Sequence, residues 1–177
     1  MCAGTLPATT PYNGSVKKWL IVGRRRLVVC GVVAGLFALQ GCASGGRGVE
    51  SSVLPRGWPV PYDVARISSV FGAPRGSSRH KGVDLTAPKG TKVRTTADGR
   101  VSFAGRSGDF GRLVIVEHSG GYETRYAHLK SIEVKKGGKL KRGAILGTVG
   151  KSGNATGFHL HYEVRLQGTA VNPKSYL

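Results

Sequence analysis

Acidic residues are scarce in this sequence of 177 residues. Nine Asp and Glu stand against 27 Lys and Arg, which gives a formal net charge of +18 at pH 7. Such an excess predicts an anionic partner or surface, for example nucleic acid, phospholipid or an acidic wall polymer. Long apolar runs are also lacking, and no run reaches 18 residues, which excludes an ordinary multi-spanning membrane protein. The length predicts a single domain with a short appendage.

The first 41 residues contain no Asp or Glu and have the pattern of a bacterial export signal. Three arginines at 24–26 precede residues 27–39, in which every residue is apolar or Gly. A spanning helix needs about 20 residues, so this stretch fits the hydrophobic region of a signal peptide. It ends in Leu39-Gln40-Gly41-Cys42, which resembles the lipobox of bacterial lipoproteins. That resemblance implies removal of residues 1–41 and lipidation of Cys42. The alternatives are an ordinary signal peptide with a chance cysteine and a twin-arginine signal.

Only three cysteines occur, and Cys2 and Cys30 lie in the predicted signal peptide. Cys42 then remains alone, so no intrachain disulfide is possible in the mature chain. The signal peptide holds five of the 27 basic residues and none of the nine acidic ones, which leaves the mature chain at +13. Residues 42–61 contain Gly, Ser and Pro without apolar periodicity and predict a flexible tether. The alternative is an ordered arm that docks on the domain near Trp58.

Amphipathic helical patterns of ten residues are lacking after residue 62. Short β-branched or alternating runs between Gly-containing turns instead predict an all-β domain over residues 62–177. Strands are expected near residues 91–94, 99–105, 113–118, 123–128, 144–149 and 159–166. Residues 90–101 and 138–147 form a weakly duplicated half-motif that also occurs in biotinyl and lipoyl carrier domains. The carrier function is excluded, because no lysine stands in the expected tight-turn context.

Histidine is rare too, yet four of the five histidines fall in three short stretches with spacings that suit a metal site. His80 and Asp84 are four residues apart, and a backbone turn at Gly82 would let both reach one ion. His159 and His161 are two apart in an expected strand, so both imidazoles project from one face. The ordinary interpretations are a solvated loop histidine for the first stretch and a polar strand face for the second.

The third stretch, residues 124–129, alternates in the same way and places Thr124, Tyr126 and His128 on one face of an expected strand. A catalytic zinc takes three N or O ligands from the protein and keeps one position open. Asp84 and two histidines would supply that number and leave two histidines for acid–base work. The spacing leaves open which of His159 and His161 would bind the metal. The fifth histidine, His118, is interpreted as structural.

These stretches resemble the lysostaphin-like (LytM-type) zinc endopeptidases, which cut peptidoglycan cross-bridges. The resemblance runs from residue 67 to residue 177 and is carried by SVFG at 69–72, HKGVD at 80–84, APKGTKV at 87–93, ADGRV at 97–101, YAHL at 126–129, TGFHLHYEVR at 156–165 and VNP at 171–173. It implies a two-layer antiparallel β-sheet fold of the barrel-sandwich hybrid type. It further implies that Zn²⁺ is held by His80, Asp84 and His161, and that His128 and His159 flank the reacting water as base and oxyanion stabiliser.

The sequence therefore predicts an exported zinc endopeptidase that hydrolyses peptide cross-links of peptidoglycan in the cell envelope. Peptide stems are the expected partners, with the membrane contacted through lipidated Cys42, and we expect a monomer. The residue after Cys42 is Ala43 rather than Asp, which favours the outer membrane if the host has two membranes. If access to the cleft is regulated, the tether, the anchor or a partner protein must do it.

Two other functions are weighed against this prediction. Some relatives that have lost zinc ligands act as non-catalytic activators of cell-wall hydrolases, but all five positions are present here. Nucleic-acid binding is disfavoured, since neither a platform of stacking aromatic residues nor a recognition helix is apparent. The loop between Gly72 and His80 is short and rich in small and basic residues, so the rim of the cleft is expected to differ from that of typical members.

Overall fold

The structure is a computed structural model that describes residues 53–177. The predicted signal peptide, Cys42 and the first part of the predicted tether lie outside the described residues. Within residues 53–177, no helix has the length and apolar character needed to cross a membrane.

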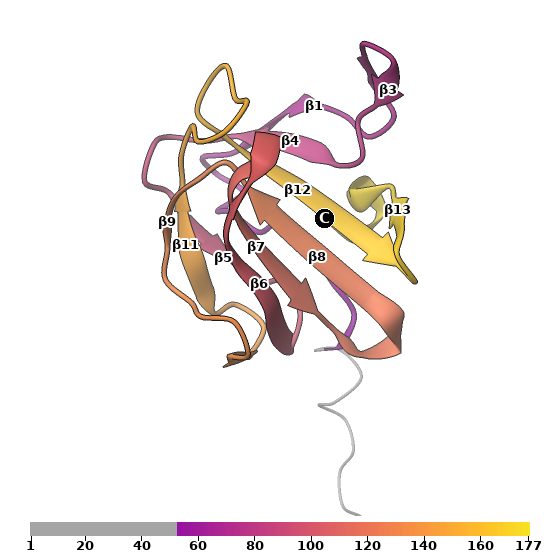
Figure 1. Ribbon diagram of the computed structural model, residues 1–177, viewed down its shortest axis with the longest axis vertical. Helices are drawn as coiled ribbons and strands as arrows, with labels where there is room; N and C mark the ends of the chain where they lie inside the picture. Colours follow the sequence, from indigo (N-terminus) through magenta and orange to yellow (C-terminus); the bar gives the residue numbers. More distant parts are fainter. Residues whose placement is uncertain (1–52) are drawn as a thin grey trace, which may run out of the picture. The chain divides into compact units, whose positions relative to one another are not determined.

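One large antiparallel sheet forms most of the domain (Figure 1). Its strands follow the order β1-β4-β12-β8-β7-β6-β10, and β13 pairs with β12. The strands are β1 (Arg66–Ser69), β4 (Val83–Thr86), β6 (Gly99–Ser107), β7 (Gly111–Glu117), β8 (Tyr122–Ala127), β10 (Lys139–Leu140), β12 (His159–Leu166) and β13 (Thr169–Val171). Because β4, β12 and β8 are neighbours, residues from three distant parts of the sequence meet at the middle of this sheet.

A second sheet has the order β5-β11-β9 and consists of β5 (Lys92–Arg94), β9 (Leu129–Ile132) and β11 (Ile145–Val149). A separate hairpin pairs β2 (Pro74–Arg75) with β3 (Ser78–Arg79). Short 3-10 turns complete the fold at η1 (Gly108–Phe110), η2 (Ser119–Gly121) and η3 (Pro173–Tyr176).

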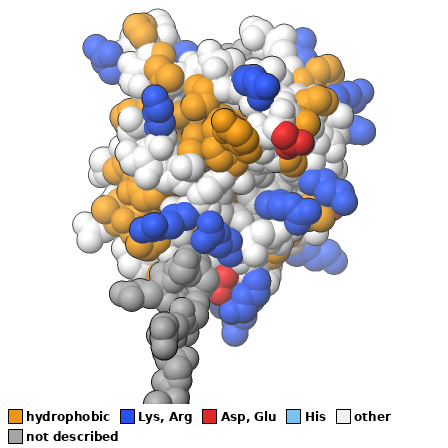
Figure 2. All heavy atoms as spheres, turned by 180° about the vertical axis from the view of Figure 1, so that it is seen from behind, with side chains coloured by type: hydrophobic (Ala, Val, Ile, Leu, Met, Phe, Trp, Pro, Cys, Tyr) orange, Lys and Arg blue, Asp and Glu red, His pale blue; other side chains and the backbone are white. Residues whose placement is uncertain are grey.

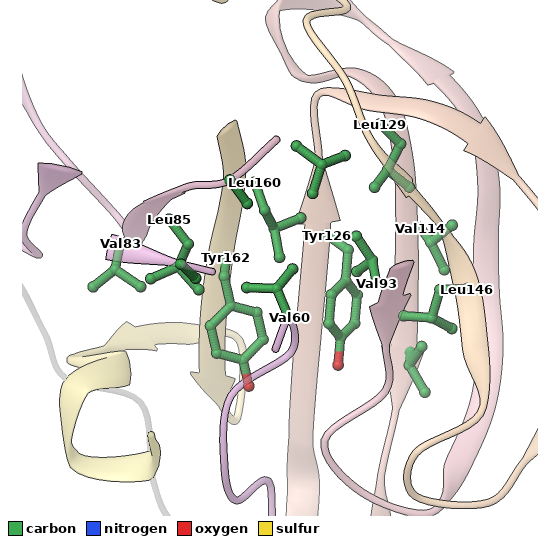
Figure 3. Packing of buried hydrophobic residues seen from close by; sticks show 14 of the residues in the cluster. Val60, Val83, Leu85, Val93, Val114, Tyr126, Leu129, Leu146, Leu160 and Tyr162 are labelled. Atoms are coloured by element: carbon green, nitrogen blue, oxygen red, sulfur yellow. The ribbon is translucent and has the colours of Figure 1, made fainter. Parts of the chain in front are cut away.

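The hydrophobic core lies between the two sheets, and Figure 3 shows side chains of both meeting there. Tyr126 of β8 and Tyr162 of β12 are register partners, are fully buried, and have ring centroids 5.4 Å apart. The hydroxyl groups of both tyrosines reach the Thr96 side chain. Burying a side chain of this size contributes roughly 2–3 kcal/mol. Since side chains alternate along a strand, the burial of Tyr162 directs His161 to the opposite face of the sheet.

The all-β prediction is confirmed. The strand expected at 159–166 is found as β12, whereas β4 and β9 were not predicted. In β4, Val83, Asp84 and Leu85 are all buried, so its sequence lacks the alternation of a half-exposed strand. The stretch after residue 128 is not among the expected strands, but β9 pairs with β11 there.

The last residues of the predicted tether lie against the domain. The backbone N–H of Arg56 donates to the carbonyl of Thr96 at 3.1 Å, and that of Gly57 donates to the carbonyl of Tyr176 at 2.7 Å. Val60 is only 2% exposed and belongs to the core. Residues 56–61 thus form an ordered arm on the domain, which was the alternative to a flexible tether.

Candidate metal site

Three of the predicted site residues meet where β4 and β12 pair. His161 and Asp84 are register partners on these strands, and His80 lies just before β4. The Nδ1 atom of His161 is 2.9 Å from Oδ1 of Asp84, and Nε2 of His80 is 3.1 Å from the same oxygen. The two imidazole nitrogens are 3.0 Å apart. The three side chains are buried, and their ligand atoms could hold one metal ion.

Gly82 lies at a bend of the backbone between His80 and Asp84, as the sequence predicted. It has no positive φ, and a Cβ atom there would lie 2.4 Å from the backbone oxygen of Tyr162. Glycine is therefore required because β12 approaches closely.

The hydrogen bonds of the two histidines fit a bound cation. Nδ1 of His80 donates to the carbonyl of Val70 at 2.9 Å, so its Nε2 carries the lone pair. In His161 the two ring nitrogens have the opposite roles. Nε2 donates to Oε1 of Glu163 at 3.1 Å, which leaves the lone pair on Nδ1. Both lone pairs and Oδ1 of Asp84 then face one point. A tetrahedral zinc site has ligand atoms about 3.4 Å apart, so small outward shifts would accommodate the ion.

The charges of this cluster are coupled. Burial alone would raise the pKa of Asp84, but when protons rather than a cation occupy the nitrogens that face it, hydrogen bonds from His161 and His80 hold that pKa far below its usual range. Burial opposes protonation of His161, yet hydrogen bonds with Asp84 and Glu163 raise its pKa. The site thus stabilises positive charge at its centre and keeps Asp84 ionised.

His128 and His159 lie beside the three clustered residues. Their ring centroids are 4.8 Å apart, and His128 is 5.9 Å from the ring of His161. Nδ1 of His128 donates to the carbonyl of Ser152 at 2.8 Å, and Nδ1 of His159 donates to the carbonyl of Gly157 at 3.0 Å. In both rings Nε2 is left as the proton acceptor. Burial lowers the pKa of His128 to about 4, so its imidazole is neutral at pH 7.

The position of His128 corrects one expectation from the sequence. Strand alternation had placed it on the same face as Tyr126, which points into the core. The structure instead gives His128 a φ of 61°, directly after β8. A left-handed backbone is unusual for a residue other than glycine, and such strain is concentrated at functional sites. It redirects the side chain from the core face to the face of His161.

Two further residues contact the cluster and were not given roles from the sequence. Glu163 is 1% exposed, and its second oxygen accepts from Nε of Arg165 at 2.8 Å. It follows His161 by two residues in the same strand, so the i, i+2 spacing could have identified it. Arg75, on the hairpin, forms an ion pair with Oδ2 of Asp84, the oxygen that faces away from the histidines. This contact gives the rim of the cleft a basic residue, as the composition of the loop had suggested.

The fifth histidine lies apart from this group. His118, just after β7, donates from Nδ1 to the carbonyl of Asp98 at 2.7 Å, and its Nε2 is 2.7 Å from Oγ1 of Thr124. Burial lowers the pKa of His118. These contacts agree with a structural role.

Curated relatives match this domain. The DD-carboxypeptidase/endopeptidase Mpg of Neisseria meningitidis serogroup B is 43% identical over 120 residues, covering 65% of this chain and 28% of Mpg. The murein hydrolase activator NlpD of Escherichia coli is 36% identical over 121 residues, covering 68% of this chain and 30% of NlpD. The chain thus spans less than a third of the length of either relative.

Solved structures are similar in the same region. A zinc-containing peptidase from Vibrio cholerae is 35% identical with a TM-score of 0.61, over 65% of this chain and 37% of that one. The catalytic domain of lysostaphin from Staphylococcus simulans is 29% identical with a TM-score of 0.60, over 63% of this chain and 91% of that one. The family model described as peptidase family M23 matches residues 78–173, a segment that begins just before His80 and contains every histidine of the cluster. The fold and this match together show that the chain belongs to peptidase family M23, the LytM-type peptidases.

Proposed function

We propose that this protein is a zinc endopeptidase that hydrolyses peptide cross-links of peptidoglycan. The observation that carries the proposal is the convergence of Nε2 of His80, Oδ1 of Asp84 and Nδ1 of His161, with both histidines held in the tautomer that presents a lone pair. Two imidazoles and one carboxylate are a typical ligand set of catalytic zinc. When bound, zinc lowers the pKa of water and polarises the scissile carbonyl.

His128 and His159 supply the proton transfer in this proposal. A neutral imidazole with a free Nε2 lone pair can take a proton from attacking water, and the low pKa of His128 keeps it neutral across the physiological range. After protonation, the same imidazole can donate to the leaving amine. Its neighbour His159 can donate a hydrogen bond to the oxygen on which negative charge develops when its Nε2 carries a proton.

A cleft beside these histidines can receive an extended peptide. Its walls come from the strand edges and from the loop before β12, and its lining includes Ser68, Ser69, Thr86, Asn154, Thr156 and Phe158. Hydroxyl and amide side chains of this kind bind the polar backbone of a substrate, and the exposed ring of Phe158 offers an apolar contact.

The experiment joins metal content to hydrolysis. Full-length protein purified in detergent should contain one zinc per chain, and it should release peptides from peptidoglycan in a reaction that chelator stops. The second candidate, a non-catalytic activator of cell-wall hydrolases, is favoured by the 36% identity with a relative named as an activator. An activator would contain no stoichiometric zinc and would release peptides only when a second hydrolase is added.

We also propose that lipid on Cys42 anchors the protein to a membrane of the cell envelope, the outer membrane in a host that has two. The Leu39-Gln40-Gly41-Cys42 sequence supports this proposal, because two or more acyl chains give stable anchoring. Cys42→Ser should release the protein from the membrane fraction and abolish incorporation of a labelled fatty acid. Labelling that persists in the variant would contradict it.

A further inference from the structure

A hollow next to the cleft collects basic side chains without acidic ones. Its lining includes five cations and one aromatic ring: Lys89, Arg106, Arg112, Lys130, Lys151 and Phe158. We call this the basic hollow. On the face shown in Figure 2, Lys and Arg side chains likewise far outnumber Asp and Glu.

The cations of the basic hollow lack carboxylate partners among residues 53–177. Elsewhere in that range arginines and lysines do pair, as Arg75 does with Asp84 and Lys141 with Asp98. Moreover, Arg106 and Arg112 are register partners on β6 and β7. Like charges directly opposite on neighbouring strands destabilise a sheet. The repulsion between Arg106 and Arg112 therefore destabilises the sheet, and a bound anionic ligand would offset this repulsion.

The Ser152 side chain connects chain segments that line the basic hollow. Its Oγ accepts from the backbone N–H of Arg112 at 2.8 Å and donates to the carbonyl of Leu129 at 2.9 Å, directly before Lys130. At Gly150 a Cβ atom would lie 2.4 Å from the backbone nitrogen of Lys130, so the segment before Lys151 packs tightly there. The segments that carry Arg112, Lys130 and Lys151 are thereby fixed relative to one another.

The same segment connects the basic hollow to the proposed catalytic site. The carbonyl of Ser152 accepts from Nδ1 of His128 at 2.8 Å. Phe158 lines both the hollow and the cleft, and Nζ of Lys89 lies 5.7 Å from its ring centroid. A peptide in the cleft can therefore extend past Phe158 into the hollow.

From this continuity we infer that the basic hollow is a subsite for carboxylate groups of the peptide bound in the cleft. The inference rests on the proposed function, since peptide stems of peptidoglycan carry free carboxylates. A concave site joined to the cleft suits a substrate segment better than a flat membrane surface. The contacts are exposed and each is weak, so several act together.

Binding to intact sacculi tests this subsite separately from hydrolysis. The full chain would carry His128→Ala, so that binding is measured without cleavage. A hollow variant, Arg106→Gln with Arg112→Gln and Lys130→Gln, is compared with a control that loses the same charge at exposed sites outside the hollow, Lys135→Gln with Lys136→Gln and Lys139→Gln. Thermal unfolding of both establishes that they fold, and Lys130→Gln alone is the milder variant.

We expect the hollow variant to bind about tenfold more weakly than the control at low salt, with a difference that shrinks at about 0.5 M salt. Amidation of the sacculus carboxylates should remove the difference. Equal weakening of both triple variants would overturn the inference. It would also be overturned if the hollow variant binds phosphatidylglycerol vesicles more weakly than the control and the difference on sacculi persists after amidation. If wild-type protein fails to cleave peptidoglycan, the proposed function fails while this comparison still gives its own answer.

Discussion

Nε2 of His161 lies 3.1 Å from Oε1 of Glu163, a carboxylate that is 1% exposed and is held from its other side by Arg165. Glu163 therefore fixes both the orientation and the tautomer of His161. A carboxylate behind a histidine ligand also raises its basicity. The candidate metal cluster thus depends on a residue that does not belong to it.

Replacing this carboxylate should weaken metal binding without removing a ligand. In Glu163→Gln we expect zinc affinity to fall about 10- to 100-fold, measured by competition with a chromophoric chelator. The matched control is Glu133→Gln, because Glu133 is exposed and its side chain accepts from Ser131 rather than from a histidine. Equal zinc affinity in the two variants would show that Glu163 does not position His161.

The histidines of the site should separate into two classes. His161→Ala should lose zinc and activity together. His128→Ala should keep its zinc and lose about 10²- to 10⁴-fold in kcat, because it removes the proton acceptor alone. Metal content per chain and hydrolysis of peptidoglycan are measured in parallel, and loss of zinc from the His128 variant would mean that the roles are wrongly assigned.

Close packing at Gly82 should make even a small side chain intolerable. Gly82→Ala places a Cβ atom 2.4 Å from the backbone oxygen of Tyr162, so β4 and β12 must separate. We expect the free energy of unfolding to fall by about 3 kcal/mol in denaturant titrations. Gly157→Ala is the control, because nothing lies within 4 Å of a Cβ there. A Gly82 variant as stable as the control would contradict this account.

His118 should make the fold sensitive to mild acid. Burial lowers its pKa from the ordinary 6.5, so the unfolded chain binds a proton that the folded chain resists. The stability that neutral His118 gives the folded chain is therefore present in full above about pH 6.5 and is lost as the pH falls toward the pKa of His118 in the folded chain. Between pH 8 and pH 5.5, with chelator present, wild-type protein should lose more stability to urea than His118→Asn does. Equal losses would show that His118 does not resist protonation.

The sequence was sufficient where strand alternation holds. It placed His159 and His161 on one face of 159–166, and β12 has these bounds with Tyr162 in the core. It was not sufficient for β4, which is buried on both faces and shows no alternation. Nor could it place His128, whose left-handed backbone breaks the alternation of β8. That conformation depends on contacts with Phe110 and Ser152, which are distant in the sequence.

Digestion of purified peptidoglycan tests the central claim most directly. The full-length protein in detergent is incubated with peptidoglycan in three forms: as purified, with chelator, and with zinc restored after chelation. Mass spectrometry of the products should reveal new peptide ends that disappear with chelator and return with zinc, and their masses identify the bond that is cut. Zinc-loaded protein that produces no new peptide ends would contradict the endopeptidase account.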